Sequence, residues 1–342
     1  PMDGVMLGFV ARELDSVLRD GRVDRVIQPE KDEIHLLIRA GGANHRLVLS
    51  ASASAARAHL SSHAKTGPME PPMLCMLLRK YLCGGRVLSV QRIAGDRILK
   101  IDISNLSELG DPVTRTLIIE IMGRHSNIIL CAADGRIIDA ARHVGQDISR
   151  VRQVMPGLPY AYPPSQGKLD PDTATSAAIA ASLIAAGGKL DKAIGASIAG
   201  FSPQAAREAA ARIGLDGSSL IADIDVQQAA DALEAYLRTM PTLSPCVVTL
   251  DDTDAPTDVF PFPQTHLSMA HIREFDSPSA ALDAYFRENL DVVFLTPLQD
   301  SLMPGRYFYG TDNHLSTNGV TMRTAQVIDA LTKQLQGEGI AP

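Results

Sequence analysis

Apolar positions in the first part of the chain follow two different periods, which predict two kinds of element. Val5, Phe9, Leu14 and Leu18 recur at helical spacing, and Asp20-Gly21 ends the predicted helix. Short apolar runs separated by polar turns follow, a pattern that is typical of an antiparallel meander. The first three expected strands are Arg22–Gln28, Glu33–Ile38 and His45–Leu49.

A second helix and several more strands complete the front half of the chain. The helix is expected over Met73–Leu82, because Pro71-Pro72 opens it and Gly84-Gly85 stops it. The further strands are expected over Val87–Ile93, Ile98–Ile103, Arg115–Met122, Ile128–Cys131 and Arg136–Asp139. This order of helices and strands predicts an α+β domain built on an antiparallel sheet.

The pattern becomes helical and alanine-rich between residues 170 and 240, after a proline-containing linker at residues 160–167. Within it, Leu190–Ile194 leads through Gly200 to a helix start with Ser202 as N-cap and Pro203 at the first helical position. This order resembles a helix-hairpin-helix, whose free N–H groups would bind a phosphate without sequence preference. A plain helical hairpin packed between domains explains the pattern equally well.

Strand-like runs return after Thr242, and Ser279–Glu288 begins another helix. The last part of the chain combines an apolar run, Val292–Leu295, with an amphipathic helix over Val320–Leu335. Four segments are therefore expected. They are a front domain (residues 1–163), an inserted all-α helix-hairpin-helix module (164–241), a return segment (242–290) and a short α/β segment (291–342).

Composition narrows the class of protein. Of the 342 residues 45% are hydrophobic, which is ample for globular cores, yet no apolar run approaches the ~18 residues of a membrane span. The start has no basic segment followed by an apolar one, so no secretion signal is expected. The four cysteines are far apart and form no CxxC pair, which predicts reduced thiols, no metal site and no cofactor. We expect a cytoplasmic protein that does not contact a membrane.

Charge is distributed unevenly, although the net charge is −7. Residues 1–155 hold 21 Lys and Arg against 17 Asp and Glu, whereas the remainder holds 11 against 22. A mildly basic front and an acidic back favour a localised phosphate-binding face over a general polyanion binder. Ordinary scatter of charged residues would give a similar imbalance.

The turn between two hydrophobic strands at residues 123–127 carries four side chains that can donate hydrogen bonds. Arg124 can donate two to a phosphate, and His125, Ser126 and Asn127 can add more. Glu120, in the preceding strand, could orient Arg124 by a charge-assisted hydrogen bond. Taken alone, the segment is better explained as a polar turn whose Ser and Asn bond to their own backbone.

A second candidate is the pair Asp96-Arg97, which opens a strand after a turn marked by Gly95. Because side chains alternate along a strand, one of the two can anchor the scaffold while the other reaches a ligand. A solvated turn pair is the simpler explanation of the local pattern. Arg79 and Lys80 could extend a basic face, or they could interact with the C-terminal end of their helix.

Several long motifs in fixed order resemble the NFACT family, known as RqcH in bacteria and NEMF in animals and first labelled fibronectin-binding protein A. The motifs are Val26–Ile34, Asn44–Ala51, Pro71–Lys80, Gly95–Ile98, Glu108–Asp111, Glu120–Leu130 and Pro156–Tyr160. The resemblance runs over roughly residues 3–288 and ends where relatives continue into a long coiled coil.

The resemblance implies a function in ribosome-associated quality control. It implies binding to a large ribosomal subunit blocked by peptidyl-tRNA, recruitment of alanyl-tRNA and template-free addition of alanines. Peptidyl transfer itself would belong to the ribosome, so the protein would not be an enzyme. In the family the pair that corresponds to Asp96 and Arg97 is implied to contact tRNA. The coiled coil and a downstream RNA-binding domain are missing here, which puts full tailing activity in doubt.

Residues 292–342 do not match the family. Asp312 and His314, ahead of a glycine and a closing helix, resemble the final block of an SGNH-type hydrolase. The Gly-Asp-Ser block that would supply the serine is absent, so we expect this segment to be catalytically inert.

Three other functions are weaker hypotheses. One is a cell-surface adhesin, as the old family label suggests, and another is an esterase fragment. The third comes from DNA glycosylases of a related fold, which use an N-terminal proline amine as nucleophile. Here Met2 follows Pro1, which suggests a remnant ahead of the natural start, and the four-cysteine zinc finger of those glycosylases is absent.

Overall fold

The computed structural model describes residues 2–164, 166–267 and 271–290, together with two short pieces, 308–309 and 314–315. The chain divides into two units, residues 1–288 and residues 289–342. The described residues of the second unit are the end of helix α7 and two short antiparallel strands, β13 (Phe308–Tyr309) and β14 (His314–Leu315). The predicted elements Val292–Leu295 and Val320–Leu335, and also Asp312, lie outside the described residues. The hydrolase-like end therefore stays a prediction.

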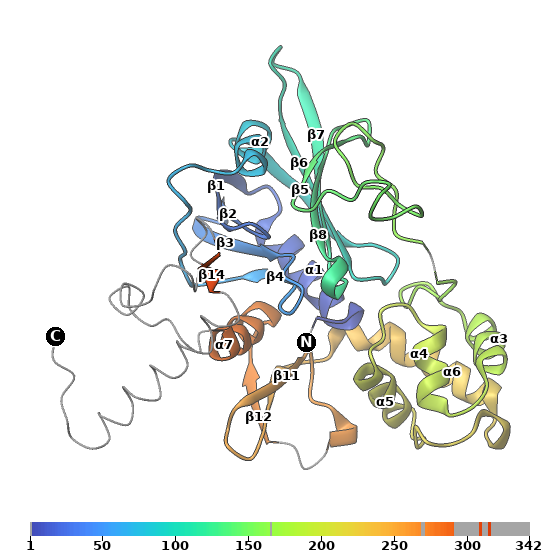
Figure 1. Ribbon diagram of the computed structural model, residues 1–342. Helices are drawn as coiled ribbons and strands as arrows, with labels where there is room; N and C mark the ends of the chain where they lie inside the picture. Colours follow the sequence, from blue (N-terminus) through green and yellow to red (C-terminus); the bar gives the residue numbers. More distant parts are fainter. Residues whose placement is uncertain (1, 165, 268–270, 291–307, 310–313, 316–342) are drawn as a thin grey trace, which may run out of the picture. The chain divides into compact units, whose positions relative to one another are not determined.

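The first unit is built on a nine-stranded antiparallel sheet in the order β4-β3-β2-β1-β5-β6-β7-β8-β9 (Figure 1). Its strands are β1 (Arg22–Glu30), β2 (Glu33–Ala40), β3 (Ala43–Ser50), β4 (Arg57–Leu60), β5 (Arg86–Arg92), β6 (Ile98–Leu106), β7 (Pro112–Glu120), β8 (Asn127–Cys131) and β9 (Ile137–Ala140). The expected α+β class is confirmed, and every expected strand of the front half is present. Strand β4 was missed, because its polar residues Arg57 and His59 are buried rather than exposed.

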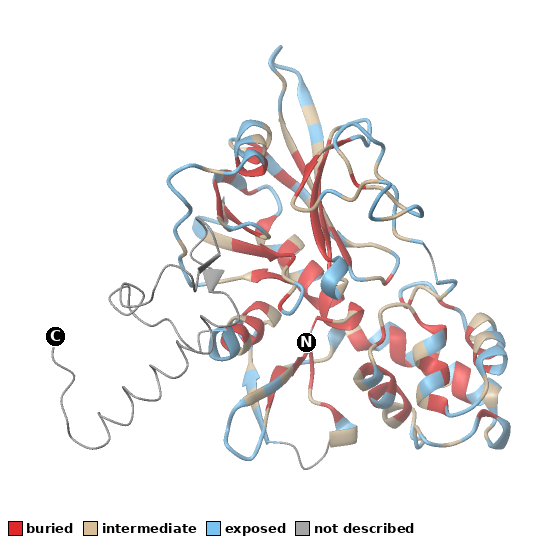
Figure 2. Ribbon diagram, in the orientation of Figure 1, coloured by how far each residue is buried: buried red, intermediate tan, exposed pale blue. Residues whose placement is uncertain are grey.

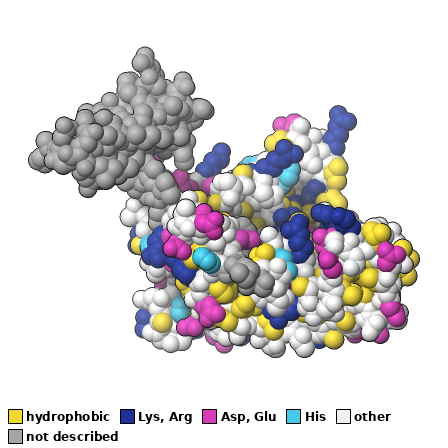
Figure 3. All heavy atoms as spheres, turned by 90° about the horizontal axis from the view of Figure 1, so that it is seen from below, with side chains coloured by type: hydrophobic (Ala, Val, Ile, Leu, Met, Phe, Trp, Pro, Cys, Tyr) yellow, Lys and Arg dark blue, Asp and Glu magenta, His cyan; other side chains and the backbone are white. Residues whose placement is uncertain are grey.

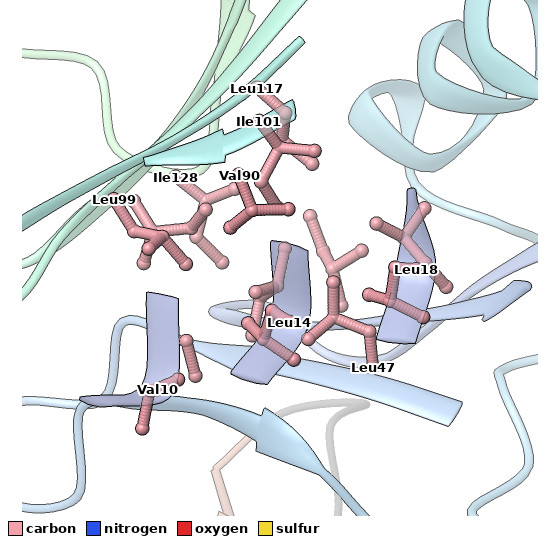
Figure 4. Packing of buried hydrophobic residues seen from close by; sticks show 14 of the residues in the cluster. Val10, Leu14, Leu18, Leu47, Val90, Leu99, Ile101, Leu117 and Ile128 are labelled. Carbon is pink, nitrogen blue, oxygen red and sulfur yellow. The ribbon is translucent and has the colours of Figure 1, made fainter. Parts of the chain in front are cut away.

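Helices α1 (Gly4–Leu18) and α2 (Met73–Leu82) supply much of the core against this sheet, and both were expected from the sequence. Leu14 and Leu18 of α1 are fully buried, and Figure 4 shows Leu14 facing Val90 of β5. Burying each such side chain contributes about 1.5–3 kcal/mol. Burial is concentrated on α1 and the inner face of the strands, whereas the tip of the β6–β7 hairpin is exposed (Figure 2).

The alanine-rich region folds into four helices, α3 (Ser176–Ala186), α4 (Leu190–Ser197), α5 (Pro203–Arg212) and α6 (Val226–Thr239). They enclose a second hydrophobic core of their own. Val5 and Phe9, in the first turns of α1, belong to this core rather than to the sheet core. Helix α1 therefore packs against both cores and joins them.

The return segment forms a separate three-stranded sheet in the order β11-β10-β12. Its strands are β10 (Cys246–Leu250), β11 (Pro256–Phe260) and β12 (His271–Phe275), and helix α7 (Pro278–Leu290) follows. Side chains alternate along β10: Cys246 and Val248 pack into the sheet core, and Val247 packs into the helical core. The segment therefore contacts the front domain without extending its sheet. The domain boundaries at residues 163, 241 and 290 stay predictions.

The four cysteines are free, and three of them are buried. Burial, with the nearby charge of Glu120, raises the pKa of Cys131 to about 11, so this thiol stays protonated at neutral pH. Among the described helices, none has the length and apolar content needed to cross a membrane.

Candidate nucleic-acid interface

Three glycines bring the turn between β5 and β6, the start of α1 and the start of α5 into direct backbone contact. The Gly4 N–H donates to the carbonyl oxygen of Gly200 at 2.8 Å. A Cβ added to Gly200 would lie 2.2 Å from the carbonyl oxygen of Gly95, and one added to Gly4 would lie 2.4 Å from the Cα of Gly200. Gly95 and Gly200 also have positive φ angles of 72° and 76°. Only glycine fits this junction.

A cavity of about 620 Å³ lies beside the junction, between the turn that opens β6 and the start of α5. Four residues predicted from two distant parts of the sequence line it: Asp96, Arg97, Gly200 and Ser202. Apolar groups from both sides of the junction complete its walls. The volume is in the range of ordinary ligand sites. The structure thus brings together two candidate sites that local patterns could not connect.

Asp96 and Arg97 have different structural roles in the wall of the cavity. The Asp96 carboxylate accepts the backbone N–H of Arg97 at 2.7 Å, and the Arg97 carbonyl accepts the N–H of Ile121 at 2.9 Å. Asp96 is half-buried and holds the turn, whereas the Arg97 side chain is exposed. This geometry agrees with the expectation that one of the pair anchors the scaffold. Ligand contact by Arg97 stays a prediction.

Ser202 caps α5 as predicted, accepting the N–H of Ala205 at 3.2 Å. Its hydroxyl also donates to Asp3 at 2.6 Å, and Asp3 caps α1 by accepting the N–H of Met6 at 2.8 Å. Burial raises the pKa of Asp3, against hydrogen bonds from Met6 and Ser202 that lower it. A carboxyl group thus sits between two helix starts that would otherwise attract an anion. Phosphate binding at Gly200 and Ser202 stays a prediction.

The polar turn after β7 uses two of its side chains within the fold. Ser126 donates to the carbonyl of Gly123 at 2.7 Å and accepts the N–H of Met122 at 2.9 Å. Asn127 accepts the N–H groups of Ile128 and Arg142 and donates to the Arg142 carbonyl, all at 2.9 Å. This is the self-bonded turn that the local sequence favoured. Direct contact of Ser126 and Asn127 with RNA stays an untested prediction.

Glu120 does not orient Arg124, so that hypothesis was wrong. Its side chain is 1% exposed and binds Arg152 at 2.5 and 3.0 Å and the Tyr160 hydroxyl at 2.7 Å. The reason is strand alternation, which points Glu120 toward the covering loop at residues 142–163. The Nε of Arg124 instead donates to the ring of the exposed His125 at 3.1 Å. Any direct contact between the buried Glu120 and RNA stays a prediction.

The hydrogen bonds that Glu120 accepts from Arg152 and Tyr160 hold the start of the segment at residues 160–167, which the sequence predicted only to be a linker. Burial and the adjacent charge of Glu120 raise the pKa of Tyr160, so its hydroxyl remains a hydrogen-bond donor. Tyr162 packs edge-on against Tyr160 with ring centroids 5.3 Å apart, and its side chain lines the cavity with Lys168. Arg152, Tyr162 and Lys168 were missed. The two tyrosines beside Pro163 were the only local signal.

Basic side chains do not cover the surface uniformly. On the face viewed from below, Lys and Arg side chains form separate clusters with acidic side chains among them (Figure 3).

The family model described as "NFACT N-terminal and middle domains" matches residues 3–294. The chain belongs to the NFACT family. This NFACT chain is 36% identical over 285 residues to "Rqc2 homolog RqcH" of Bacillus subtilis, an alignment that covers 83% of this chain and 48% of the relative. It is 40% identical over 172 residues to the protein of the same name in Streptococcus pneumoniae, covering 50% of this chain and 31% of the relative. The chain thus spans about half the length of the curated relatives it matches.

Solved structures agree with the NFACT assignment. The fibrinogen binding protein of Staphylococcus aureus superposes with a TM-score of 0.70 at 28% identity, covering 83% of this chain and 98% of that one. The N-terminal part of the fibronectin/fibrinogen-binding protein of Streptococcus suis gives a TM-score of 0.69 at 30% identity, covering 84% and 99%. The NFACT fold of this chain is therefore shown by sequence and structure together.

Proposed function

We propose that this NFACT chain is the tRNA-reading part of an RqcH-like ribosome-associated quality control factor. It binds alanyl-tRNA and the large ribosomal subunit that carries peptidyl-tRNA, and it promotes template-free addition of alanine. The ribosome performs peptidyl transfer, and the chain contributes binding and positioning in the cytoplasm. The relatives named RqcH support the proposal, and one observation carries it. Asp96 and Arg97, which the family resemblance associates with tRNA, line one cavity with the start of α5.

The cavity has the chemistry needed to receive an unpaired nucleotide. Its apolar walls, the aromatic ring of Tyr162 and the planar guanidinium of Arg97 suit stacking of a base that has left its helix. Arg97 and Lys168 add positive charge for the adjoining phosphates. Stacking of each base contributes about 1–3 kcal/mol, enough to decide whether tRNA binds.

The test is tRNA binding to the full chain across a salt series. The variant Asp96→Ala/Arg97→Ala is compared with Asp134→Ala/Arg136→Ala, which removes a similar acid and base from the exposed turn at the opposite end of β8. We expect at least a tenfold loss of affinity in the first variant, in line with about 1.4 kcal/mol or more, and little change in the second. Equal affinities for both variants would refute the proposed site.

A second candidate function follows from the names of the solved neighbours, which refer to fibrinogen and fibronectin binding. Surface plasmon resonance against immobilised fibronectin, with the same two variants, separates this function from RNA binding. Tight fibronectin binding in a protein that ignores tRNA would favour the adhesin. Fibronectin binding that is weak and unaffected by Asp96→Ala/Arg97→Ala would leave the tRNA proposal in place.

A further inference from the structure

Five arginines gather on the outer face of the sheet, away from the cavity. In the strand register Arg22 of β1 lies opposite Arg39 of β2 on one side and Arg86 of β5 on the other. A second row, one step along the strands, places Arg25 of β1 and Arg46 of β3 on either side of Leu37. We refer to these five residues (Arg22, Arg25, Arg39, Arg46 and Arg86) as the arginine face.

Strand alternation, together with a β-bulge in β1 between Val23 and Arg25, puts these side chains on one side of the sheet. Their neighbours Val23, Val26 and Ile38 are buried in the sheet core, so the intervening arginines must point outward. Neighbouring strands are about 4.8 Å apart, so the row from Arg39 to Arg86 spans about 10 Å. The two rows are separated by about 6–7 Å along the strands. The result is a group of arginine side chains on one side of the sheet, with the β1 bulge between the two rows.

The arginine face is not neutralised by the fold. Among the described residues, the one carboxylate paired with it is Asp24, 3.6 Å from Arg22. Arg39 donates to the side-chain oxygen of Asn44 at 3.2 Å, and Arg86 donates to the backbone oxygen of Asp20 at 2.9 Å. Burial and the like charge of Arg25 lower the pKa of Arg46 from its ordinary value. Arg46 also hydrogen-bonds to the ring of His35 at 3.0 Å, and His35 binds Glu33 at 2.7 Å. The five arginines thus carry more positive charge than their carboxylate partner Asp24 offsets.

Other parts of the outer face are covered. The loop at residues 142–163 packs over β6–β9 around Val154, and residues 65–67 cross the far end of β1 and β2, where Lys65 binds Glu33 at 3.1 Å. Four of the five arginines are exposed, and Arg46 is half-buried. The open part of the sheet is therefore the part that carries the unbalanced positive charge.

We infer that the arginine face binds the phosphate backbone of double-stranded RNA, at a site separate from the cavity. The two rows contain no aromatic side chain that could stack a base, so recognition depends on charge. Arg can donate two parallel hydrogen bonds to a phosphate, and neighbouring strands present several arginines at once. The choice of RNA over other polyanions rests on the proposed function. With the cavity holding an unpaired nucleotide, the arginine face would hold a helical part of the same or a neighbouring RNA.

The test uses the full chain and an RNA duplex of about 16 base pairs with arbitrary sequence. The variant Arg25→Gln/Arg39→Gln/Arg86→Gln is compared with Lys31→Gln/Arg136→Gln/Arg287→Gln, which removes the same charge from exposed positions elsewhere. We expect at least a tenfold loss of duplex affinity in the first variant and less than about twofold in the second. The slope of log affinity against log salt should fall by about 2–3, since each lost phosphate contact removes about 0.9.

Two further measurements keep the outcome decisive. Arg25→Lys/Arg39→Lys/Arg86→Lys keeps the charge and should retain most of the salt slope, so a loss of slope in the Gln variant alone is due to the lost charge. Binding of tRNA by the Asp96→Ala/Arg97→Ala variant is measured alongside, so failure of the cavity proposal is visible separately from failure of the arginine face. Equal duplex affinity in the Gln variant and its control would overturn the inference. Tighter binding to anionic phospholipid vesicles than to the duplex would also overturn it.

Discussion

The cavity beside the glycine junction and the turn at residues 123–127 both look like ligand sites in the sequence, but the fold treats them differently. In the turn, the side chains of Ser126 and Asn127 form hydrogen bonds with the protein's own backbone. At the cavity, Asp96 holds the backbone and leaves the Arg97 side chain exposed. A cluster of donors is therefore a poor guide to a binding site until their internal partners are known.

The largest expected loss of stability comes from a substitution in the glycine junction beside the cavity. Gly200→Ala places a Cβ 2.2 Å from the Gly95 carbonyl oxygen, where both partners are backbone and neither can move aside. We expect a loss of about 4 kcal/mol or more in the free energy of unfolding, measured by chemical denaturation. Gly214→Ala is the matched control, because Gly214 has φ 79° but nothing within 4 Å of its Cβ position. The control should cost about 1–2 kcal/mol.

A smaller loss of stability is expected from a substitution at Glu120, which lies just before the turn at residues 123–127. Glu120→Gln leaves Arg152, whose side chain is 17% exposed, without its carboxylate partner. Breaking such a buried pair costs about 3 kcal/mol. Glu108→Gln is the control, since Glu108 is 88% exposed and binds Lys80 at 3.4 Å, and it should change stability by less than about 0.5 kcal/mol. Equal melting temperatures of the two variants would contradict the structural role of Glu120.

Asn127 and Arg97 should respond in opposite ways. Asn127→Ala removes the acceptor of one buried and one part-buried N–H group. We therefore expect a loss of about 2 kcal/mol in unfolding free energy with unchanged tRNA affinity of the folded protein. Arg97→Gln should leave stability unchanged and weaken tRNA binding about tenfold. Thermal unfolding measures the stability of both variants, and fluorescence titration measures their affinity for tRNA. Loss of tRNA affinity in Asn127→Ala at equal stability would place the site at the turn instead.

The difference between the two regions also shows what the sequence could predict. Local signals were sufficient for α2, because Pro71-Pro72 and Gly84-Gly85 bound it on both sides. They were also sufficient for Ser202 as the cap of α5. These features depend on residues within a few positions of one another.

Features that depend on distant partners could not be predicted. Strand β4 was missed because His59 is buried through a hydrogen bond to Asp283, at 3.3 Å, which lies 224 residues later. Asp96 and Ser202 were each singled out, yet nothing local shows that they line one cavity. The position of Tyr162 depends on its packing against Tyr160, which is hydrogen-bonded to Glu120. The spacing of residues in the sequence does not reveal a hydrogen bond between residues 40 positions apart.

The smallest expected effect tests the carboxyl group between the two helix starts. Burial raises the pKa of Asp3 above its ordinary value of 3.8. A raised carboxyl pKa means that the fold prefers the protonated form. The stability that protonated Asp3 contributes to the fold is therefore fully present below pH 3.8, and it is lost as the pH rises through the pKa of Asp3 in the folded protein. Above that pKa the ionised group also repels a phosphate at the start of α5.

Asp3→Asn removes this charge and keeps a side chain that can cap α1. We expect tRNA affinity to rise about threefold at neutral pH, as the loss of about 0.6 kcal/mol of repulsion predicts. The increase in affinity of the parent on acidification should become smaller in the variant. Asp147→Asn, in an exposed loop, is the control. An unchanged affinity in Asp3→Asn would mean that no phosphate approaches the start of α5, and that the cavity holds only the base.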